Sequence, residues 1–199
     1  MNRVTVINTL ISRLGYSRYL EIGCNDDGTF RQITAPTKTG VDPVRGGTIR
    51  TTSDAFFARS PGMFDVIFID GDHHHAQVHR DVVNSLAHLA PLGTIVMHDC
   101  LPPDPGHESL NLCGTTWRAF VQTRTRADLD SFVCDFDYGI GIVRKAPNPA
   151  IVQIAQSMDA LTYADLSAHR ARWMRPATMA HLVGRIASWP KGRRTGRAS

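Results

Sequence analysis

Two apolar runs that each end in acidic and histidine side chains constrain the fold of this chain more than any other feature. The runs cover residues 64–69 and 94–97, and the segment between them has apolar residues at helical spacing. This pattern predicts a strand, a helix and a second strand. Because a right-handed crossover returns the second strand parallel to the first, both polar clusters are expected at one edge of a sheet. The residues brought together there are Asp70, Asp72, His73, His98 and Asp99.

Helical and extended segments alternate in the first part of the chain. Apolar residues at i, i+3 and i+4 predict an amphipathic helix over residues 4–14, ended by Gly15. Extended segments are predicted at 19–23, 40–43 and 48–52, and short helical ones at 30–33 and 55–58, the last with Ser53 and Asp54 as N-cap residues.

The second part of the chain is predicted to hold a long loop at 101–114, a helix from Thr115 and a hairpin. Extended segments at 132–136 and 140–143 flank the turn sequence Asp137-Tyr138-Gly139. Helical spacing resumes after residue 147. The predicted fold class is α/β: a doubly wound, mostly parallel seven-stranded sheet with an antiparallel edge hairpin.

Length and composition set the domain organisation and exclude several classes of partner. We expect one main domain at 1–146, a helical extension at 147–190 and a basic, disordered tail at 191–199. The net charge of +4 arises from the C-terminal basic residues, so nothing indicates a nucleic-acid partner. No apolar run is long enough to cross a membrane, and four cysteines without a pairing pattern favour a cytoplasmic protein.

The turn after the first predicted strand indicates the kind of ligand. Ligands of parallel sheets bind outside the carboxyl ends of the strands, and an acid about 20 residues further on suits the two hydroxyls of a ribose. Asp42 occupies that place, whereas Glu21 ends the first strand, with glycines only at Gly23 and Gly28. An acid there would repel a pyrophosphate and favours a ligand that carries an amine.

These residues carry a family resemblance. YLEIGCNDDG followed by GVDP resembles the first two motifs of class I S-adenosylmethionine-dependent methyltransferases, and TTSDAFF resembles their segment beside the adenine. The chain departs from the family pattern at Asn25 and Asp27, where glycines are usual. The cofactor-binding residues implied by this resemblance are Glu21, Gly23, Asn25, Asp42, Ser53, Asp54 and Asp70.

The sequences IDGDHHH and MHD are similar to those of metal-dependent O-methyltransferases that act on sugars and natural-product glycosides. This resemblance implies Asp70 and Asp99 as metal ligands, with His98 in the place of a further acid. Two carboxylates suit Mg²⁺, and a ligating histidine would shift the preference toward Mn²⁺. The implied activity is O-methylation of a sugar hydroxyl, because a divalent cation and a base can activate this poor nucleophile. His73 and Asp72 are the two candidates for the base.

Several alternatives remain open at this point. Strand-end acids also cap helices, a catechol would suit the same metal site, and the fold could serve as a non-catalytic cofactor-binding protein. The aromatic-free loop at 101–114, which we expect to contact the substrate as a lid or else to be disordered, favours a sugar over a phenol. Asp137 and Tyr138, on the hairpin turn, are expected at the wrong edge of the sheet for catalysis unless the tail folds over. The expected partner is a small-molecule or oligosaccharide substrate, and the question of a homodimer stays open.

Burial can also be predicted for other polar and aromatic residues. Surface positions are expected for His74, His75, His79 and His88, and core positions for Trp117 and Phe120.

Overall fold

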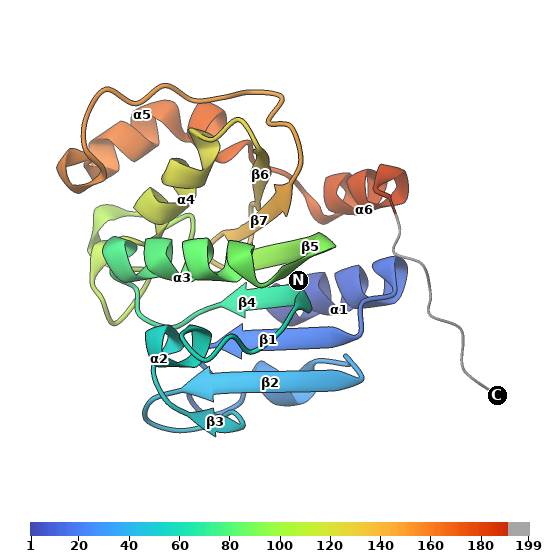
Figure 1. The fold of residues 1–199 in the computed structure, drawn as a ribbon. Coiled ribbons are helices and arrows are strands. Elements are labelled where there is room, and N and C mark those ends of the chain that lie inside the picture. The colour runs from blue at the N-terminus through green and yellow to red at the C-terminus, as the bar shows by residue number, and fades with distance from the viewer. Residues whose placement is uncertain (191–199) are drawn as a thin grey trace.

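A single seven-stranded sheet forms the centre of the molecule, as a computed structural model describes it for residues 1–190 (Figure 1). The predicted tail at 191–199 lies outside the described residues. The strand order is β3-β2-β1-β4-β5-β7-β6; β1 to β5 are parallel, and β7 runs antiparallel to both β5 and β6. This confirms the predicted fold class. The strands are β1 Arg18–Ile22, β2 Thr37–Asp42, β3 Ile49–Arg50, β4 Phe64–Ile69, β5 Leu89–Met97, β6 Leu129–Cys134 and β7 Ile140–Lys145.

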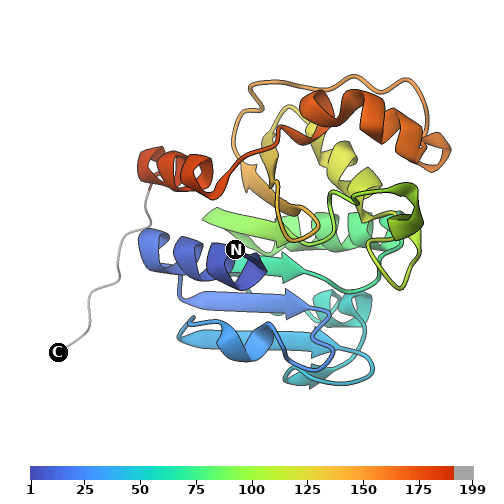
Figure 2. The same cartoon turned by 180° about the vertical axis from the view of Figure 1, so that it is seen from behind.

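Helices cover both faces of the sheet. Figures 1 and 2 show α1 and α6 on one face, and α2, α3, α4 and α5 on the other. Each face has its own apolar core, as expected for a doubly wound fold. The helices are α1 Arg3–Leu14, α2 Ser53–Phe57, α3 His75–Ala87, α4 Thr116–Arg124, α5 Tyr163–Met174 and α6 Met179–Ser188, and short 3₁₀ turns lie at η1 Phe30–Gln32, η2 Pro105–Glu108 and η3 Met158–Ala160.

Local sequence explains where α1 begins and ends. The Asn2 side chain accepts a hydrogen bond from the Thr5 N–H, and Gly15 ends the helix in the left-handed conformation, as predicted. At α2 the prediction was one residue late, because the capping side chain belongs to Thr52, which accepts from the Ala55 N–H. The predicted core residues Trp117 and Phe120 are fully buried.

The segment at 152–161 departs from its predicted helical form. Only Met158–Ala160 forms a helical turn there. Val152 and Leu161 are buried in the core that α3, α4 and α5 share. These two residues fix an irregular segment, here called the strap at 152–161, to the core. The helical prediction was wrong because apolar periodicity alone does not distinguish such a segment from a helix.

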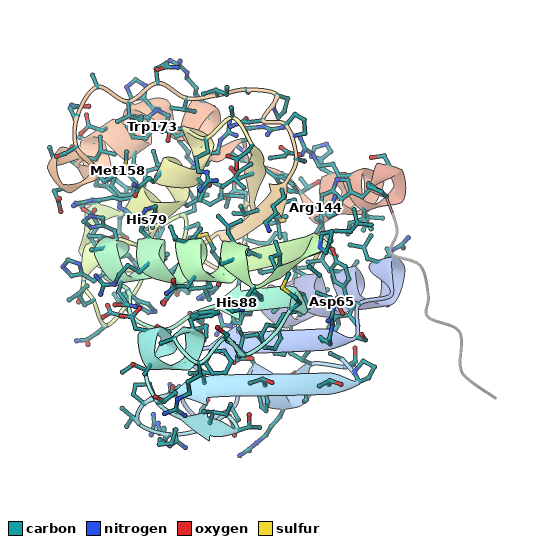
Figure 3. All side chains as sticks on the ribbon, in the orientation of Figure 1. Asp65, His79, His88, Arg144, Met158 and Trp173 are labelled. Carbon is teal, nitrogen blue, oxygen red and sulfur yellow. The ribbon has the colours of Figure 1, made fainter. Side chains whose placement is uncertain are left out.

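The C-terminal extension closes one edge of the sheet. The N–H of Ala177 donates to Val133 O at 2.8 Å, and the Asp135 N–H donates to Ala177 O at 3.0 Å. Unpaired edge strands are open to association with other chains, so this short pairing protects β6. Trp173 of the extension, labelled in Figure 3, stacks on Trp117 of α4, and the ring centroids are 6.5 Å apart. Within residues 1–190, no helix combines the length and apolarity that a bilayer crossing needs.

Candidate active site

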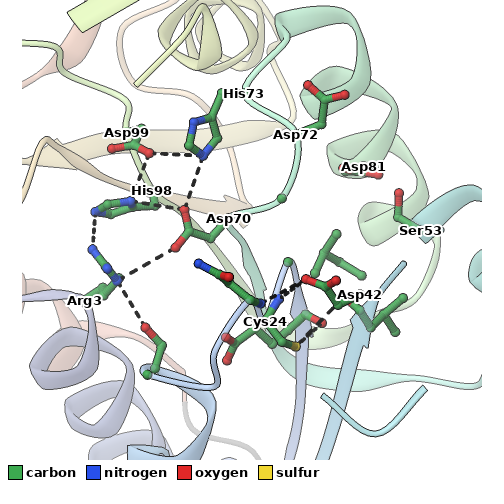
Figure 4. A pocket seen from close by; sticks show the side chains of 18 of the residues that line it. Arg3, Cys24, Asp42, Ser53, Asp70, Asp72, His73, Asp81, His98 and Asp99 are labelled. Carbon is green, nitrogen blue, oxygen red and sulfur yellow. Dashed lines mark hydrogen bonds and ion pairs between the residues drawn. The ribbon is translucent and has the colours of Figure 1, made fainter. Parts of the chain in front are cut away.

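A cleft of about 1330 Å³ opens at the carboxyl ends of the parallel strands. It extends from the end of β2 to the turn between β6 and β7 (Figure 4). All eleven side chains singled out from the sequence line it, which follows from the strand order because β2, β1, β4 and β5 are neighbours. They are Glu21, Gly23, Asn25, Asp42, Ser53, Asp54, Asp70, Asp72, His73, His98 and Asp99.

Gly23 allows β1 and β4 to approach each other closely at the floor of the cleft. Its φ is +85°, and a Cβ there would collide with the backbone of Asp70 and Gly71. A glycine is therefore required by the neighbouring strand as well as by any ligand. The close approach places Asp70 directly beside the turn that follows β1.

Two residues with side chains adopt a glycine-like backbone conformation in the turn after β1. Asn25 and Asp27, where the family pattern has glycines, adopt left-handed conformations with φ of +48° and +65°. Asn and Asp are the side-chain-bearing residues that tolerate this region best. Both are also anchored: Asn25 Oδ1 accepts from Arg45 Nε at 2.6 Å, and Asp27 Oδ1 accepts from the Gly47 N–H at 2.6 Å. The departure in sequence therefore preserves the path of the loop.

Asp42 organises two loops at the edge of the cleft. Its carboxylate accepts four backbone N–H groups, from Cys24, Asn25, Val44 and Arg45, at 2.8–3.0 Å. Burial opposes its ionisation, but these hydrogen bonds prevail and lower the pKa of Asp42. Each carboxylate oxygen accepts two of these N–H groups, so a ligand hydroxyl at Asp42 would share an acceptor oxygen with the backbone.

Glu21 is a buried acid at the end of β1. Burial raises its pKa to about 8, against the effect of the hydrogen bond that it accepts from the Tyr19 hydroxyl. In the free protein the carboxyl is therefore largely protonated at neutral pH. A cationic amine beside it would favour the ionised form.

Asp70, His73 and Asp99 form one compact group of metal-capable atoms. One ligand atom from each lies within 4.8 Å of the others. His73 Nε2 is 3.4 Å from Asp99 Oδ2 and 3.8 Å from Asp70 Oδ1 (Figure 4). The nearby carboxylate of Asp70 raises the pKa of His73. Asp99 has a φ of +56°, a conformation that is costly for a residue with a side chain and is frequent at functional sites.

His98 adjoins this group and contacts charged residues on both sides of its ring. Nδ1 lies 3.2 Å from Asp70 Oδ1 and 3.1 Å from Asp99 Oδ2. Although burial opposes protonation, the carboxylates of Asp137, Asp70 and Asp99 raise the pKa of His98 to about 11. The guanidinium of Arg3, only 2.7 Å from Nε2, instead favours a ring protonated on Nδ1 alone, because arginine cannot accept a hydrogen bond. Both influences place a proton on Nδ1, between the two carboxylates.

Arg3 and Asp137 are parts of the site that the sequence interpretation missed. Arg3 reaches the cleft from the first turn of α1, where the apolar stripe of that helix carries no signal for it. Asp137 was expected at the wrong edge of the sheet for catalysis, and that prediction was wrong: its Oδ1 lies 3.7 Å from His98 Nε2. Because β6 is antiparallel to β7, and β7 to β5, β6 ends at the same edge as β5 and carries the turn to the site.

The two base candidates point in different directions. His73 faces the acidic pair, whereas the exposed Asp72 points away from it (Figure 4). Asp72 Oδ1 accepts from the His74 N–H at 2.7 Å and so stabilises the turn that leads into α3.

His75 was expected on the surface, but it is buried, and its Nε2 lies 3.3 Å from Asp159 Oδ1. The prediction was wrong because the strap at 152–161 covers the start of α3.

Ser53 lies in a polar cluster with two residues of α3. Gln77 Nε2 donates to Ser53 Oγ at 3.3 Å and to Asp81 Oδ1 at 3.1 Å. Asp81 is buried, and burial raises its pKa to about 6. The sequence signal for Asp81 is an acid at helical spacing with the buried Val78 and Ser85.

The loop after β5 is tied to the site at both ends. The Thr115 N–H donates to His73 O at 2.8 Å, and Gly114 packs against the same residue. Near the other end, the N–H groups of Cys100 and Leu101 donate to the turn between β6 and β7. His107 and Leu112 line the cleft. The loop is therefore a structured wall of the cleft, which excludes the alternative of disorder and keeps the alternative of a segment that contacts the substrate.

Comparison with known proteins agrees with this architecture. Residues 6–100 match the model of a family described as a methyltransferase domain. No curated protein sequence matches the chain. A Staphylococcus aureus protein described provisionally as a caffeoyl-CoA O-methyltransferase is similar in fold, with a TM-score of 0.60 at 15% identity over 73% of this chain and 85% of that one. A Bacillus cereus O-methyltransferase in complex with SAH has a TM-score of 0.54 at 13% identity over 71% of this chain and 79% of that one.

A third structure is similar over part of its length. The MycE methyltransferase from the mycinamycin pathway, in complex with Mg and SAH, has a TM-score of 0.50 at 17% identity, and the match covers 76% of this chain but 50% of that one. Such distant likenesses define the fold. The fold is that of class I methyltransferases, and about half of the chain is similar to a methyltransferase domain.

Proposed function

We propose that the enzyme transfers the methyl group of S-adenosylmethionine to a sugar hydroxyl with the help of a bound divalent cation. The observation that carries this proposal is the compact group of Asp70, His73 and Asp99 inside the same cleft as Asp42. One end of the cleft thus offers acceptors for a ribose, and the other offers groups that can activate an oxygen nucleophile.

The assignment of S-adenosylmethionine as the cofactor rests on the acidic side chains at the floor of the cleft. Asp42 is a carboxylate with a lowered pKa in the lining of the cleft, where ribose hydroxyls can donate to oxygens that also accept backbone N–H groups. Glu21 can take up the amino group of the methionine moiety. Ser53 and Asp54 lie beyond Asp42, where we place the adenine. The bound SAH named for the Bacillus cereus neighbour supports the same ligand class here.

The donor set fits a hard divalent cation. Asp70 and Asp99 each offer carboxylate oxygen, the ligand that Mg²⁺ prefers, and Mn²⁺ would tolerate an added imidazole. A third donor would be His73 or His98; His98 must first lose the Nδ1 proton that it shares with the two acids. Bound there, the cation lowers the pKa of a coordinated hydroxyl and orients it. The Mg named for MycE supports this assignment.

His73 is the base that we favour over Asp72. Its ring faces the acids, and its Nδ1 is buried without a hydrogen-bond partner among residues 1–190. The ordinary pKa of an imidazole is near neutrality, and the carboxylates raise that of His73, so its ring, once deprotonated, takes a proton readily from a hydroxyl. Nε2 cannot ligate a cation and accept a proton at once, so in this assignment the metal rests on the two carboxylates.

A finer resemblance suggests a particular acceptor. The small size and Arg/Ala-rich composition resemble the mycobacterial 1-O-methyltransferase of methylmannose polysaccharide synthesis, which would make the acceptor the 1-hydroxyl of a mannoside. A catechol is the second candidate, because vicinal phenol oxygens suit the same site. A cytoplasmic location completes the proposal, supported by four cysteines that form no disulfide.

Turnover assays test this proposal directly. The purified enzyme is supplied with S-adenosylmethionine and mannosides, glucosides or catechols, and S-adenosylhomocysteine is measured. We expect turnover with a sugar, loss with EDTA and recovery with Mg²⁺ or Mn²⁺. Turnover that EDTA leaves unchanged would refute the metal, and turnover with catechols alone would refute the sugar. Cofactor binding without any turnover would support a non-catalytic protein.

A pair of acid variants separates the metal role from a structural one. Asp99→Asn should lower turnover about 100-fold or more, because a carboxylate ligand is lost while Asn keeps the left-handed backbone. Asp72→Asn, a matched change two residues from Asp70, should leave turnover nearly intact. S-Adenosylhomocysteine affinity should be nearly unchanged in both variants. Equal loss of turnover in both would contradict the assignment.

A further inference from the structure

We propose that Tyr138 and His107 form a stacking platform that selects an acceptor with an apolar ring beside its vicinal hydroxyls. This inference rests on the proposed function and specifies its substrate class. The platform lies where the turn between β6 and β7 meets the loop after β5, and both residues line the cleft.

The ring of Tyr138 lies between His98 and His107, which belongs to the loop after β5. Its centroid lies 6.4 Å from that of His98, nearly perpendicular at 88°, and 5.7 Å from that of His107 at 32°. Half of Tyr138 is exposed, at 50% of its full accessible area. A ring face is therefore available to a ligand at the mouth of the cleft.

The backbone holds this ring in place at some cost. Asp137, Tyr138 and Gly139 are consecutive left-handed residues, and Tyr138 has a φ of +57°. The Leu101 N–H donates to Tyr138 O at 2.8 Å, and Gly139 packs against Leu101. Tyrosine is unfavourable in this conformation, and strain of this kind gathers at functional sites. The platform is thus fixed relative to Asp99, two residues before Leu101.

The mouth of the cleft offers exposed apolar surface beside the polar groups at its floor. His98 and Asp99 are almost fully buried, whereas Leu112, which lines the cleft beside His107, is 47% exposed. The ring of Tyr138 lies 6.4 Å from that of His98, whose Nδ1 lies 3.2 Å from Asp70 and 3.1 Å from Asp99. An acceptor whose hydroxyl reaches the acids can therefore place its adjoining ring against Tyr138. An aryl glycoside and a catechol with a ring substituent share this chemistry.

Binding to the enzyme loaded with S-adenosylhomocysteine and Mg²⁺ tests the platform independently of turnover. The probes are methyl α-mannoside, phenyl α-mannoside and 4-phenylcatechol, each titrated by calorimetry or saturation-transfer NMR. The wild-type enzyme should bind a ring-bearing probe about tenfold more tightly than methyl α-mannoside, as expected for one aromatic stacking contact. Preference for the phenyl mannoside identifies a glycoside, and preference for the phenylcatechol identifies a phenol.

Three variants complete the test. Tyr138→Asn removes the ring but keeps a residue that tolerates the left-handed backbone, and it should abolish the preference. Tyr138→Phe should retain it. Leu110→Ser, in the same loop and exposed but outside the cleft lining, should change nothing. Equal binding of all three probes by the wild-type enzyme, or a preference that survives Tyr138→Asn, would overturn the platform. Failure of the proposed function differs: no S-adenosylhomocysteine forms from any acceptor, while the ring preference remains.

Discussion

The guanidinium of Arg3 lies 2.7 Å from Nε2 of His98, so the first turn of α1 touches the residue that follows β5. Arg3 also lies 3.4 Å from Asp137 Oδ1 and 3.8 Å from Asp70 Oδ2. The positive charge of this N-terminal residue thus offsets the negative charges of two acids. It also orients the imidazole toward the proposed metal ligands. Such contacts behind a ligand usually orient it and tune its basicity.

We therefore expect Arg3→Gln to lower turnover about 10- to 100-fold, because His98 and Asp70 lose the group that orients them. Steady-state assays at saturating cofactor measure the effect, and calorimetry should show an almost unchanged affinity for S-adenosylhomocysteine. Arg13→Gln, an exposed arginine in the last turn of the same helix, is the control. Unaltered turnover in Arg3→Gln would show that the contact is only structural.

Cofactor binding should release a proton from Glu21. Its pKa is raised to about 8 in the free protein, and the cationic amine of the ligand should lower it by favouring the ionised form. Affinity for S-adenosylhomocysteine should therefore rise with pH between 6 and 8, by at most about tenfold per unit. Calorimetry in buffers of different ionisation enthalpy measures the proton. Glu21→Gln should bind more weakly and show no such pH dependence; a wild-type affinity that is flat with pH would refute the contact.

Asp65 should stabilise the fold at neutral pH and not in acid. It lies at the start of β4, away from the cleft (Figure 3). Burial opposes ionisation, but the side chain of Arg18 and the N–H groups of Ser17 and Arg18 lower the pKa of Asp65. Because the folded pKa is below the unfolded one, this stability is present above about pH 4 and is lost as the pH falls through the folded pKa.

Asp65→Asn should therefore reduce the free energy of unfolding by about 1–2 kcal/mol at pH 7 and by much less near pH 2. Urea unfolding at the two pH values provides the measurement. Asp128→Asn removes a more exposed pair with Arg126 and should cost about 0–1 kcal/mol. An Asp65→Asn penalty that is as large in acid as at neutral pH would contradict the ionic origin of the effect.

The unit from β4 to β5 and the turn after β1 could be predicted because the residues that form each of them lie close together in the sequence. The run from β4 to β5 is one crossover unit, so strand periodicity and chain handedness alone bring Asp70 to Asp99. Asn25 and Asp27 show the reverse situation. Their departure from the glycine pattern could not be interpreted from sequence, because only the backbone shows that both residues adopt the left-handed conformation.

The remaining parts of the site depend on contacts between distant segments. Arg3 meets His98 across 95 positions of sequence, and Asp137 reaches the site because β7 inserts between β5 and β6. Periodicity records which face of an element is buried, but it carries no information on which distant element covers that face. The sequence by itself determined the α/β fold and the meeting of the strand-end acids at one edge, since these depend on local pattern and crossover handedness. Only the tertiary structure decided which charged side chains surround the acids and that Tyr138 stands at the mouth of the cleft.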